Sequence, residues 1–448
     1  MNFDTVKDAL VAEAKALGVE EYDVFFMEGE STSTEALKDE ISSFSSGVGG
    51  GVGFRCIVDG HMGCASTELL SEDEMKRIVH AAVENAKNLE NEDTPIIFEG
   101  SASYAEISPS TYVRPTTTEM KELALKIQAN TYQSSEYIAD GTQAGVFGER
   151  VRMRFLNSRG LSLSHEAGVS GAYVQSVVAK DGESQAAFDF VEGLCNTEAL
   201  DALSQKVTDE ALATIGATEI DSGKYDIIFS GKQMRALLST FASIFSAKNA
   251  QLGLSLLRGK EGQAVASACV TIIDDPLREE CPMKIPFDGE GVATYRKNVV
   301  ENGVLNTLLY DLTTAKKAGT TSTGNGQRAS YADAVTIRPY SFYFAPGQES
   351  EEGLLARLGD GIYITELKGL HAGADAVTGD FSIESAGFLV RGGKKETAVR
   401  SFTVAGNFFE LLASIEALSD RVHFGMPGGL TVYGSPDVLV RQMSVAGK

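Results

Sequence analysis

The chain has 448 residues, a net charge of −23, 43 % apolar residues and 23 % charged residues. This length exceeds what one hydrophobic core usually organises, so we expect two or three domains of ordinary globular composition. The acidic balance and the lack of a dense Lys/Arg cluster argue against nucleic acid as a direct partner, because phosphate binding needs a basic face.

Targeting segments and disulfides are not expected. Residues 1–18 carry acids and no continuous apolar stretch, unlike a signal peptide. The most membrane-like segment, residues 236–247, is too short to span a bilayer and predicts a buried helix. The odd number of scattered cysteines, without a CxxC pair, predicts reduced thiols and a cytoplasmic protein: Cys56, Cys64, Cys195, Cys269 and Cys281.

The first module, residues 1–110, begins with apolar residues at helical spacing over 3–17, which Gly18 ends. Residues 21–28 predict a strand, and residues 52–65 predict a hairpin that turns at an Asp-Gly pair. A capping-box pattern over Ser71–Glu74 then opens a helix that extends to about residue 89.

The glycine-rich run 47–53 lies just before the hairpin. It lacks the Lys-Ser/Thr pair of a phosphate-binding loop, and a strand follows it instead of a helix. We therefore interpret it as a tight turn or flexible loop, and a nucleotide site is the less favoured alternative.

The second module, residues 111–220, opens with a capping box at Thr116–Glu119 and a helix through residue 127. Strand-like segments over 137–191, with turns at 157–160 and 181–182, predict an antiparallel meander. A helix over about 198–215 closes this module.

The small, polar residues 216–224 mark a domain boundary, and a strand-rich domain follows over 221–448. Segregated strands and helices favour an α+β class. We expect N-terminal α/β-type modules with a mixed or antiparallel sheet, followed by the strand-rich C-terminal domain.

Metal chemistry has little support from histidine spacing. The five histidines are far apart in the sequence: His61, His80, His165, His371 and His423. His165-Glu166 opens like HExxH, but Val169 stands where the motif needs its second histidine, and Ser170 follows. We interpret His165 as an ordinary strand or turn residue.

Other candidate groups have structural alternatives that we favour. His371 could face a groove, but a histidine that holds a loop through backbone carbonyls is the more common case. Asp274-Asp275 could bind metal or transfer protons, yet carboxylates before a proline usually cap turns, and the same holds for Asp288–Gly291. No GxSxG elbow is present, and no cysteine has an activating sequence context.

The segment Gly369–Asn407 alternates short apolar strands with glycine turns. Together with other segments along almost the whole chain, it resembles the TldD/PmbA family, whose PmbA branch is also called TldE. The segments that carry the resemblance are Gly53–Arg55, Asp59–Gly60, Ala65–Thr67, Asn157–Gly160, Asp274–Pro276, Phe287–Gly291, Glu301–Leu305, Tyr310–Asp311, Ser322–Asn325, Leu370–Gly373, Thr378–Ser382, Ala405–Asn407 and Val445–Gly447.

The resemblance implies a two-part α+β protein in a zinc peptidase made of two related subunits. It implies that the TldD-like subunit carries HExxxH on a helix of the C-terminal domain, completed by a late cysteine, and that its partner lacks these residues. The family is also labelled as modulators of DNA gyrase, and it is linked to peptide-antibiotic maturation and to degradation of small or unfolded proteins.

This chain departs from the zinc-binding pattern. Residues 233–245, where the resemblance places the motif, contain neither His nor Glu, and no cysteine follows Cys281. The resemblance therefore implies the PmbA/TldE branch, no catalytic or metal residue here, and zinc in a TldD-like partner. We expect a cytoplasmic subunit that pairs with that homologue or with a second copy, and no membrane contact.

For the peptide substrate we expect a groove or interface formed by glycines and small polar residues, with His371 orienting a loop. The candidates are His371, Gly373, Thr378, Gly379, Asp380, Ser382, Thr323 and Asn325. A non-catalytic peptide- or protein-binding regulator is the alternative function. A third hypothesis is an independent hydrolase that uses Asp274, Asp275 or His371 without zinc.

Overall fold

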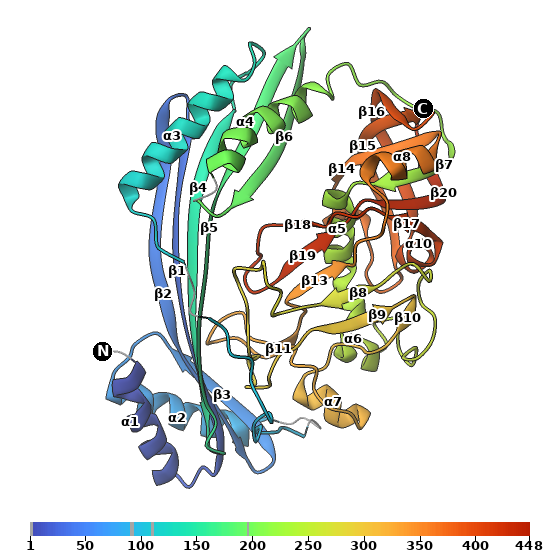
Figure 1. Ribbon diagram of the computed structural model, residues 1–448. Coiled ribbons are helices and arrows are strands. Elements are labelled where there is room, and N and C mark those ends of the chain that lie inside the picture. The colour runs from blue at the N-terminus through green and yellow to red at the C-terminus, as the bar shows by residue number, and fades with distance from the viewer. Residues whose placement is uncertain (1–2, 90–93, 109–111, 195–196) are drawn as a thin grey trace.

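The computed structural model describes residues 3–89, 94–108, 112–194 and 197–448. A long N-terminal sheet faces a strand-rich C-terminal part, and helices cover the sheet's far side (Figure 1). The predicted α+β class is confirmed. Cys195, one of the five predicted thiols, lies outside the described residues, and the other four are free thiols.

The N-terminal sheet contains six antiparallel strands in the order β3-β2-β1-β4-β5-β6. The predicted hairpin and meander are confirmed, and the strands are longer than expected. Their bounds are β1 Glu21–Leu37, β2 Glu40–Val58, β3 His61–Thr67, β4 Gln143–Asn157, β5 Ser162–Lys180 and β6 Glu183–Glu192. Strands from both predicted modules, 1–110 and 111–220, share this sheet, and the division of the chain into three domains stays a prediction.

The glycine run 47–53 is not a turn or loop, and that expectation was wrong. It lies inside β2, and Gly47–Gly53 pair with β1 in continuous register. Close contact explains two of the glycines. A Cβ atom on Gly53 would stand 2.0 Å from the carbonyl oxygen of Tyr331, and one on Gly51 would stand 2.7 Å from the Tyr331 ring. Glycine here lets a C-terminal loop lie directly on the strand.

Two pairs of helices cover the outer face of this sheet (Figure 1). Helices α1 (Phe3–Ala16) and α2 (Glu72–Lys87) pack at one end, and α3 (Thr117–Gln133) and α4 (Thr197–Leu212) pack at the other. The predicted caps are present: the Ser71 side chain accepts from the Glu74 amide, and Thr116 and Glu119 form a reciprocal capping box.

The C-terminal part contains two further sheets. In the first, of order β16-β15-β14-β7-β20-β17, an extra pairing of β16 with β20 closes five strands into a ring. The second has the order β10-β9-β8-β13-β19-β18, and β11 and β12 form a small separate pair.

The strands of the C-terminal part are β7 Gly223–Phe229, β8 Ile272–Asp274, β9 Lys297–Glu301, β10 Val304–Leu305, β11 Gly326–Gln327, β12 Thr336–Ile337, β13 Ser341–Phe344, β14 Gly361–Lys368, β15 Asp380–Arg391, β16 Lys394–Asn407, β17 Ile415–Leu418, β18 His423–Phe424, β19 Val432–Ser435 and β20 Val438–Ala446. The helices are α5 Gly231–Phe241, α6 Ala247–Gln251, α7 Leu312–Ala318, α8 Glu351–Leu358, α9 Leu370–Gly373 and α10 Phe408–Ser414, with a 3-10 turn at Ala242–Phe245.

Helix α5 lies between the two C-terminal sheets and contacts β14, β18 and β19. Its buried side chains Leu237, Leu238 and Phe241 belong to the largest apolar core of the molecule. The predicted buried helix is therefore confirmed. Among the residues that the structure describes, no helix has the length and apolar character needed to cross a membrane.

Candidate functional site

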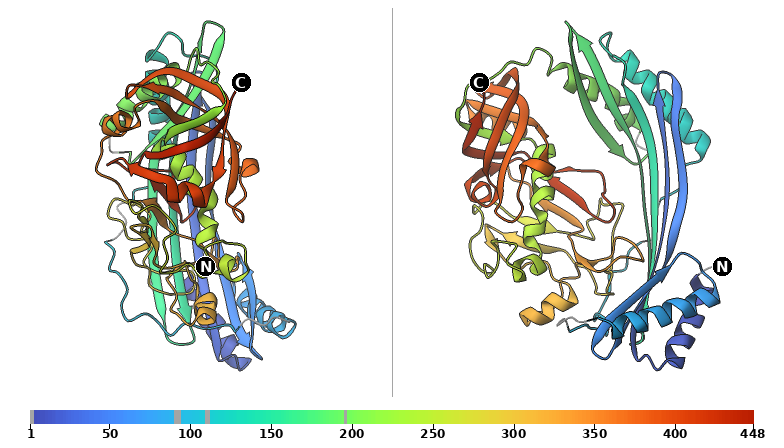
Figure 2. Two further views of the ribbon diagram at one scale, coloured as in Figure 1. Left: turned by 90° about the vertical axis from the view of Figure 1, so that its right-hand side faces the viewer. Right: turned by 180° about the vertical axis from the view of Figure 1, so that it is seen from behind.

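The candidate site lies where the inner face of the N-terminal sheet meets the C-terminal part. Side chains alternate across the sheet, so Phe25, Met153 and Phe155 point inward. They form one apolar cluster with Met283 and Phe287 of the C-terminal part. The right-hand view of Figure 2 shows the sheet standing beside the C-terminal part. This contact fixes the two parts against each other.

A buried charged cluster sits next to this apolar contact. Arg55 of β2 donates to Asp23 of β1 from Nε at 3.0 Å and from Nη2 at 2.5 Å. Arg328, which follows β11, donates from Nη2 to the other Asp23 oxygen at 2.7 Å. Burial alone would raise the pKa of Asp23, but the charges of Arg328 and Arg55 lower it. The carboxylate therefore stays ionised between two guanidinium groups.

Two further carboxyls lie in a buried turn beside these arginines. Asp288 accepts hydrogen bonds from the amides of Glu290, Val292 and Gly326, and Glu290 accepts one from the Leu312 amide. Burial raises the pKa of Asp288 to about 6, and burial together with the Asp288 charge raises the pKa of Glu290 to about 8. The two carboxyls therefore hold a shared proton to a higher pH than free carboxyls do. The prediction that Asp288–Gly291 is a turn is confirmed.

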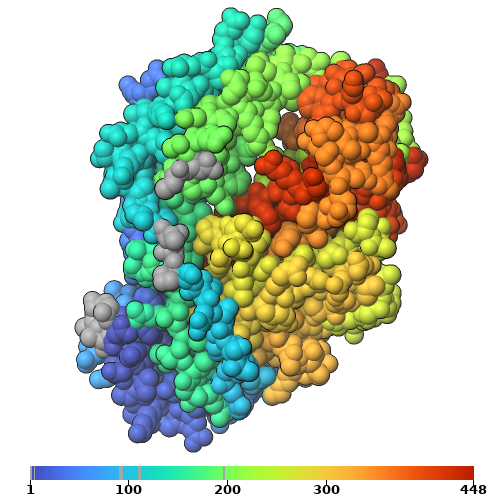
Figure 3. Space-filling model, viewed as in Figure 1, coloured from blue at the N-terminus to red at the C-terminus, as the bar shows by residue number. Residues whose placement is uncertain are grey.

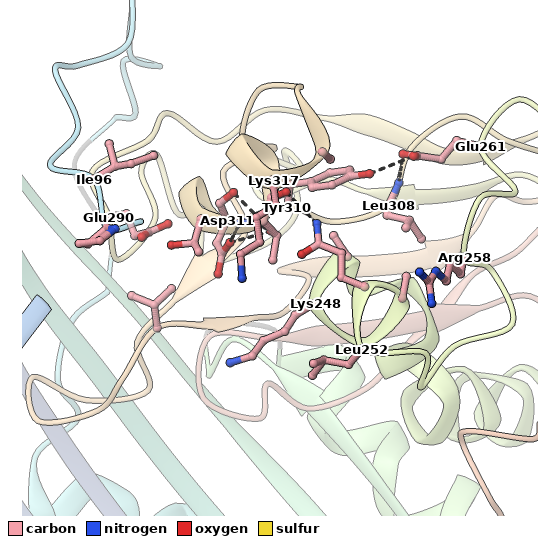
Figure 4. Close-up of a pocket in the computed structure, with 18 of the residues that line it drawn as sticks. Ile96, Lys248, Leu252, Arg258, Glu261, Glu290, Leu308, Tyr310, Asp311 and Lys317 are labelled. Carbon is pink, nitrogen blue, oxygen red and sulfur yellow. Dashed lines mark hydrogen bonds between the residues drawn. The ribbon is translucent and has the colours of Figure 1, made fainter. Parts of the chain in front are cut away.

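Glu290 and Arg55 line a cavity of about 630 Å³ between the sheet and the C-terminal part (Figure 4). At another wall, the Tyr310 hydroxyl donates to Glu261 at 2.9 Å, and the Leu308 amide donates to the same carboxylate at 2.8 Å. The cavity is amphipathic, because charged and apolar side chains both line it: Lys248, Arg258, Lys317, Glu261, Glu290 and Asp311 with Ile96, Leu252 and Leu308.

A second cavity, of about 450 Å³, lies farther along the inner face. One wall is formed by β1, β2 and β4, and the other by residues 327–338 and 428–431. Gly49 borders open space, since no atom lies within 4 Å of a Cβ atom placed on it. Figure 3 shows the surface hollowed between the sheet with α4 and the C-terminal part. An extended ligand would meet small residues such as Gly29 and Gly49 here, together with charged side chains such as Arg150 and Arg338.

The structure brings together most of the predicted groove residues. His371 and Gly373 lie on α9, and Thr378, Asp380 and Ser382 lie at or before the start of β15. A Cβ atom on Gly373 would stand 2.5 Å from the Ser382 carbonyl oxygen, and Asn407 bridges the Thr378 carbonyl and the Asp380 carboxylate. Gly379 is buried against Phe409, whereas the His371, Thr378, Asp380 and Ser382 side chains are exposed.

Thr323 and Asn325 belong to a different, buried network. Thr323 donates to the Asn325 side chain at 2.7 Å, and Asn325 donates to Asp274 at 2.7 Å. Asp274 also accepts from Lys297 and from the Tyr340 amide. Among the described residues, no hydrogen bond or ion pair joins this network to the α9 group.

Asp275 caps a turn, as predicted for a carboxylate before a proline, whereas Asp274 is the last residue of β8. Asp274 is fully buried in the network just described, and Asp275 accepts from the Leu277 amide two residues on. His165 lies on β5, as expected of an ordinary strand residue. Its Nε2 atom lies 2.5 Å from the Lys284 carbonyl oxygen, and burial lowers its pKa.

The side chains of α5 do not fit a zinc ion. Gln233 donates to the Thr365 carbonyl, Arg235 donates to the Phe424 carbonyl, and Lys232 pairs with carboxylates outside the helix. The others that point inward are apolar. Zinc in proteins needs several His, Cys, Asp or Glu ligands. Within the described ranges, no three such side chains form a group that could hold a metal ion.

Sequence reasoning missed Arg55, Arg328 and the 630 Å³ cavity. Arg55 occupies one position of a predicted strand, and it meets Asp23 only through the pairing of β1 with β2. The Asp288–Gly291 motif was noticed, but nothing in the pattern says that Glu290 faces a cavity. Only tertiary pairing brings these groups together.

Two family profiles match the chain. The profile described as PmbA/TldA metallopeptidase C-terminal domain matches residues 222–447, and the profile described as PmbA/TldA metallopeptidase domain 1 matches residues 22–86. An uncharacterized protein of Methanocaldococcus jannaschii is 28 % identical over 89 % of this chain and 92 % of its own length. Metalloprotease PmbA of Escherichia coli O157:H7 is 25 % identical over 88 % of this chain and 86 % of its own.

Solved structures share the fold over nearly the whole chain. A Thermotoga maritima protein, whose name proposes a modulator of a DNA gyrase, has a TM-score of 0.89 and 28 % identity, covering 99 % of this chain and 100 % of its own. TldE from Thermococcus kodakarensis has a TM-score of 0.89 and 22 % identity, and the match covers 98 % of this chain and 99 % of its own. At this identity, the second similarity concerns the fold alone.

Proposed function

The chain belongs to the PmbA/TldA metallopeptidase family, and we propose that it is the subunit without zinc ligands in a two-subunit peptidase of the TldD/TldE type. In this proposal the zinc-bearing homologue supplies the metal and the reacting groups. This chain helps to enclose small or unfolded peptides.

The composition of helix α5 carries the proposal. The helix lies within the matched C-terminal domain, at the place where the resemblance puts HExxxH in the zinc-bearing subunit. Gln233 and Arg235 bind backbone carbonyls, and Leu237, Leu238 and Phe241 fill the core. A helix used in this way supports the fold and leaves metal binding to another chain.

The inner face of the sheet suits a contribution to peptide binding. Extended peptides are held mainly through their main chain, and glycines and small side chains let that main chain approach. The 450 Å³ cavity offers Gly29, Gly49, Ser31 and the glycines before Leu430. The exposed α9 group with His371 and Ser382 is the second candidate wall. Thr323 and Asn325 would contribute indirectly, because their buried hydrogen bonds hold the loop to which they belong.

The cellular setting and the domain division belong to the same proposal. The scattered thiols favour a cytoplasmic protein. Strand-rich residues 221–448 would form the peptidase-like domain, and residues 1–110 and 111–220 would form the two halves of the facing wall.

The test is purification with and without a homologue that carries HExxxH. The expected result is zinc in the pair, none that is stoichiometric in this chain alone, and cleavage of unstructured peptides only by the pair. Stoichiometric zinc together with cleavage by this chain alone would refute the proposal.

A regulator without a peptidase partner is the second candidate. It is favoured by the name of the Thermotoga maritima protein, which concerns DNA gyrase. Affinity capture from the source cell separates the two functions. Recovery of gyrase without a peptidase homologue would favour the regulator, and recovery of the homologue favours the proposed subunit.

A further inference from the structure

The 630 Å³ cavity beside α6 and α7 has no assigned ligand in the proposed function. Its volume lies within the range of about 300–1,000 Å³ that is typical of small-molecule sites. Figure 4 shows Lys248 and Leu252 on one side of the cavity and Tyr310 and Asp311 on the other. The contacts that these wall residues already make indicate which kind of ligand fits between them.

The carboxyls of the wall are already bound within the protein. Glu261 accepts from the Tyr310 hydroxyl at 2.9 Å, and Glu290 accepts from an amide at the start of α7 at 2.9 Å. Asp311 accepts from the Thr314 amide at 2.7 Å and thereby caps α7. Each of these acids therefore supports the fold, and none of them needs a ligand to satisfy it.

Two cations of the wall, by contrast, lack a counterion. Among the described residues, no carboxylate forms an ion pair with Lys248 or Arg258. Arg55, which also lines the cavity, is bound to Asp23. A free ammonium and a free guanidinium favour an anion, and guanidinium groups bind carboxylates through two parallel hydrogen bonds. The neighbouring acids disfavour a second negative charge on the ligand, because like charges repel.

Apolar side chains are exposed next to these cations. The exposed fractions of Leu252, Leu254 and Leu256 are 63 %, 44 % and 57 %. Leu252 lines the cavity together with Ile96. Exposed apolar side chains that lie close together mark binding surfaces, because covering them removes apolar area from water. The ligand should therefore carry an apolar group beside its negative charge.

We propose that this cavity binds a carboxylate attached to an apolar group, with Lys248 and Arg258 holding the carboxylate and Leu252 contacting the apolar group. The C-terminal end of a peptide and a free apolar acid share this chemistry. The peptide source rests on the proposed function, since a subunit that encloses peptides meets their C-terminal ends. The binding itself requires no zinc-bearing homologue.

Isothermal titration calorimetry of the full chain alone tests the ligand chemistry. The probes are N-acetyl-alanyl-alanyl-leucine as the free acid, the same tripeptide as its C-terminal amide, octanoate, and inorganic phosphate. The amide keeps the apolar group and loses the charge, so it should bind at least about tenfold more weakly than the acid. The stronger of the two acids, tripeptide or octanoate, identifies the source of the carboxylate.

The two cations are tested together in the double variant Lys248→Gln/Arg258→Gln, which should bind either acid at least about tenfold more weakly. The matched control is Lys260→Gln/Lys316→Gln. It removes the same net charge at two exposed lysines of the adjoining loop and of α7 that do not line the cavity. The control should keep wild-type affinity, and melting temperatures confirm that both variants are folded.

The apolar contact is tested by Leu252→Ala, which should lower the affinity for both acids about three- to tenfold. Leu254→Ala is the control, because Leu254 is an exposed leucine of the same loop outside the cavity wall. It should bind the acids as the wild-type chain does.

Saturable binding of an acid that weakens in the amide, in the double cation variant and in Leu252→Ala would support the proposal. It would be overturned if neither acid bound, if acid and amide bound equally, if the cation variant matched its control, or if phosphate bound more tightly than both acids. Because these measurements use neither zinc nor a homologue, a failure here is distinct from a failure of the proposed peptidase pair.

Discussion

Arg328 donates a hydrogen bond to Asp23 across 305 positions of the sequence, at 2.7 Å. Both side chains are at least 98 % buried, since the exposed fractions are 1 % for Arg328 and 2 % for Asp23. Arg55 shares the same carboxylate, so Asp23 binds two guanidinium groups directly. Asp23 thus adds a buried ionic contact to the apolar cluster that holds the sheet against the C-terminal part.

Removal of this carboxylate should be strongly destabilising. Asp23→Ala leaves two buried guanidinium groups without their counterion, and such uncompensated charges typically cost about 3–5 kcal/mol in the free energy of unfolding. Denaturant unfolding measures the loss. Asp140→Ala is the control, because its ion pair with Lys38 is largely exposed and should contribute little. Equal effects of the two substitutions would contradict a structural role for the buried cluster.

Glu290 should make the protein less stable as the pH rises. Its folded-state pKa of about 8 lies above the ordinary value of 4.5, so between these values the folded state holds a proton that the unfolded state has released. Stability therefore falls with pH in this window, by up to about 1.4 kcal/mol per pH unit for one such group.

Glu290→Gln tests this pH dependence, because the neutral amide can still accept from the Leu312 amide. Its stability relative to the wild type should increase from pH 5 to pH 9, measured by urea unfolding. Glu396→Gln, at an exposed position of β16, should follow the wild-type profile. If Glu290→Gln gave the same pH profile as the wild type, the proton assigned to Glu290 would be wrong.

Local sequence signals predicted most of the secondary structure. Ser71 and Thr116 marked helix starts, and the Asp-Gly pairs at residues 59 and 181 marked hairpin turns, because each of these depends on residues close in sequence. The prediction for the glycine run 47–53 was wrong because its conformation depends on residues that are distant in sequence. Its conformation is set by pairing with β1 and by the distant Tyr331.

The candidate site was less predictable than the fold. His371 and Ser382 are near each other in sequence, and helix α9, which carries His371, does pack against β15, which carries Ser382. Asn325 was grouped with them because of its small polar neighbours, yet its amide binds the buried Asp274. Exposure of a polar residue depends on tertiary packing, which residue type and turn propensity do not specify.

Position 53 should not accommodate a side chain, whereas position 49 should accommodate one. Gly53→Ala places a Cβ atom 2.0 Å from the Tyr331 carbonyl oxygen, so the loop must move away from β2. Overpacking of this kind costs about 1–3 kcal/mol. Gly49→Ala meets no atom within 4 Å and should change stability by less than about 0.5 kcal/mol. Thermal unfolding compares them, and equal melting temperatures would rule out the close contact.

Asn325→Ala should destabilise the C-terminal part. It removes the 2.7 Å hydrogen bond to Asp274 and leaves that fully buried carboxylate with one donor fewer. The expected cost is about 2–3 kcal/mol, typical of a lost hydrogen bond to a charged group. Ser382→Ala, at an exposed site of the α9 group, should leave the unfolding free energy unchanged. If Asn325→Ala left the free energy of unfolding unchanged, the network would not be what holds the loop.

The α9 group should affect peptide cleavage without affecting stability. If it forms a wall of the proposed groove, His371→Ala removes one polar contact to the peptide, and kcat/KM of the pair with its zinc-bearing homologue should fall about two- to tenfold. The melting temperature should not change, because the His371 side chain is exposed. Lys394→Ala is the control, since Lys394 pairs with Arg391 at the end of β15 opposite to Asp380. Equal cleavage by both variants and the wild-type pair would remove the α9 group from the groove and leave the inner face of the sheet as the candidate wall.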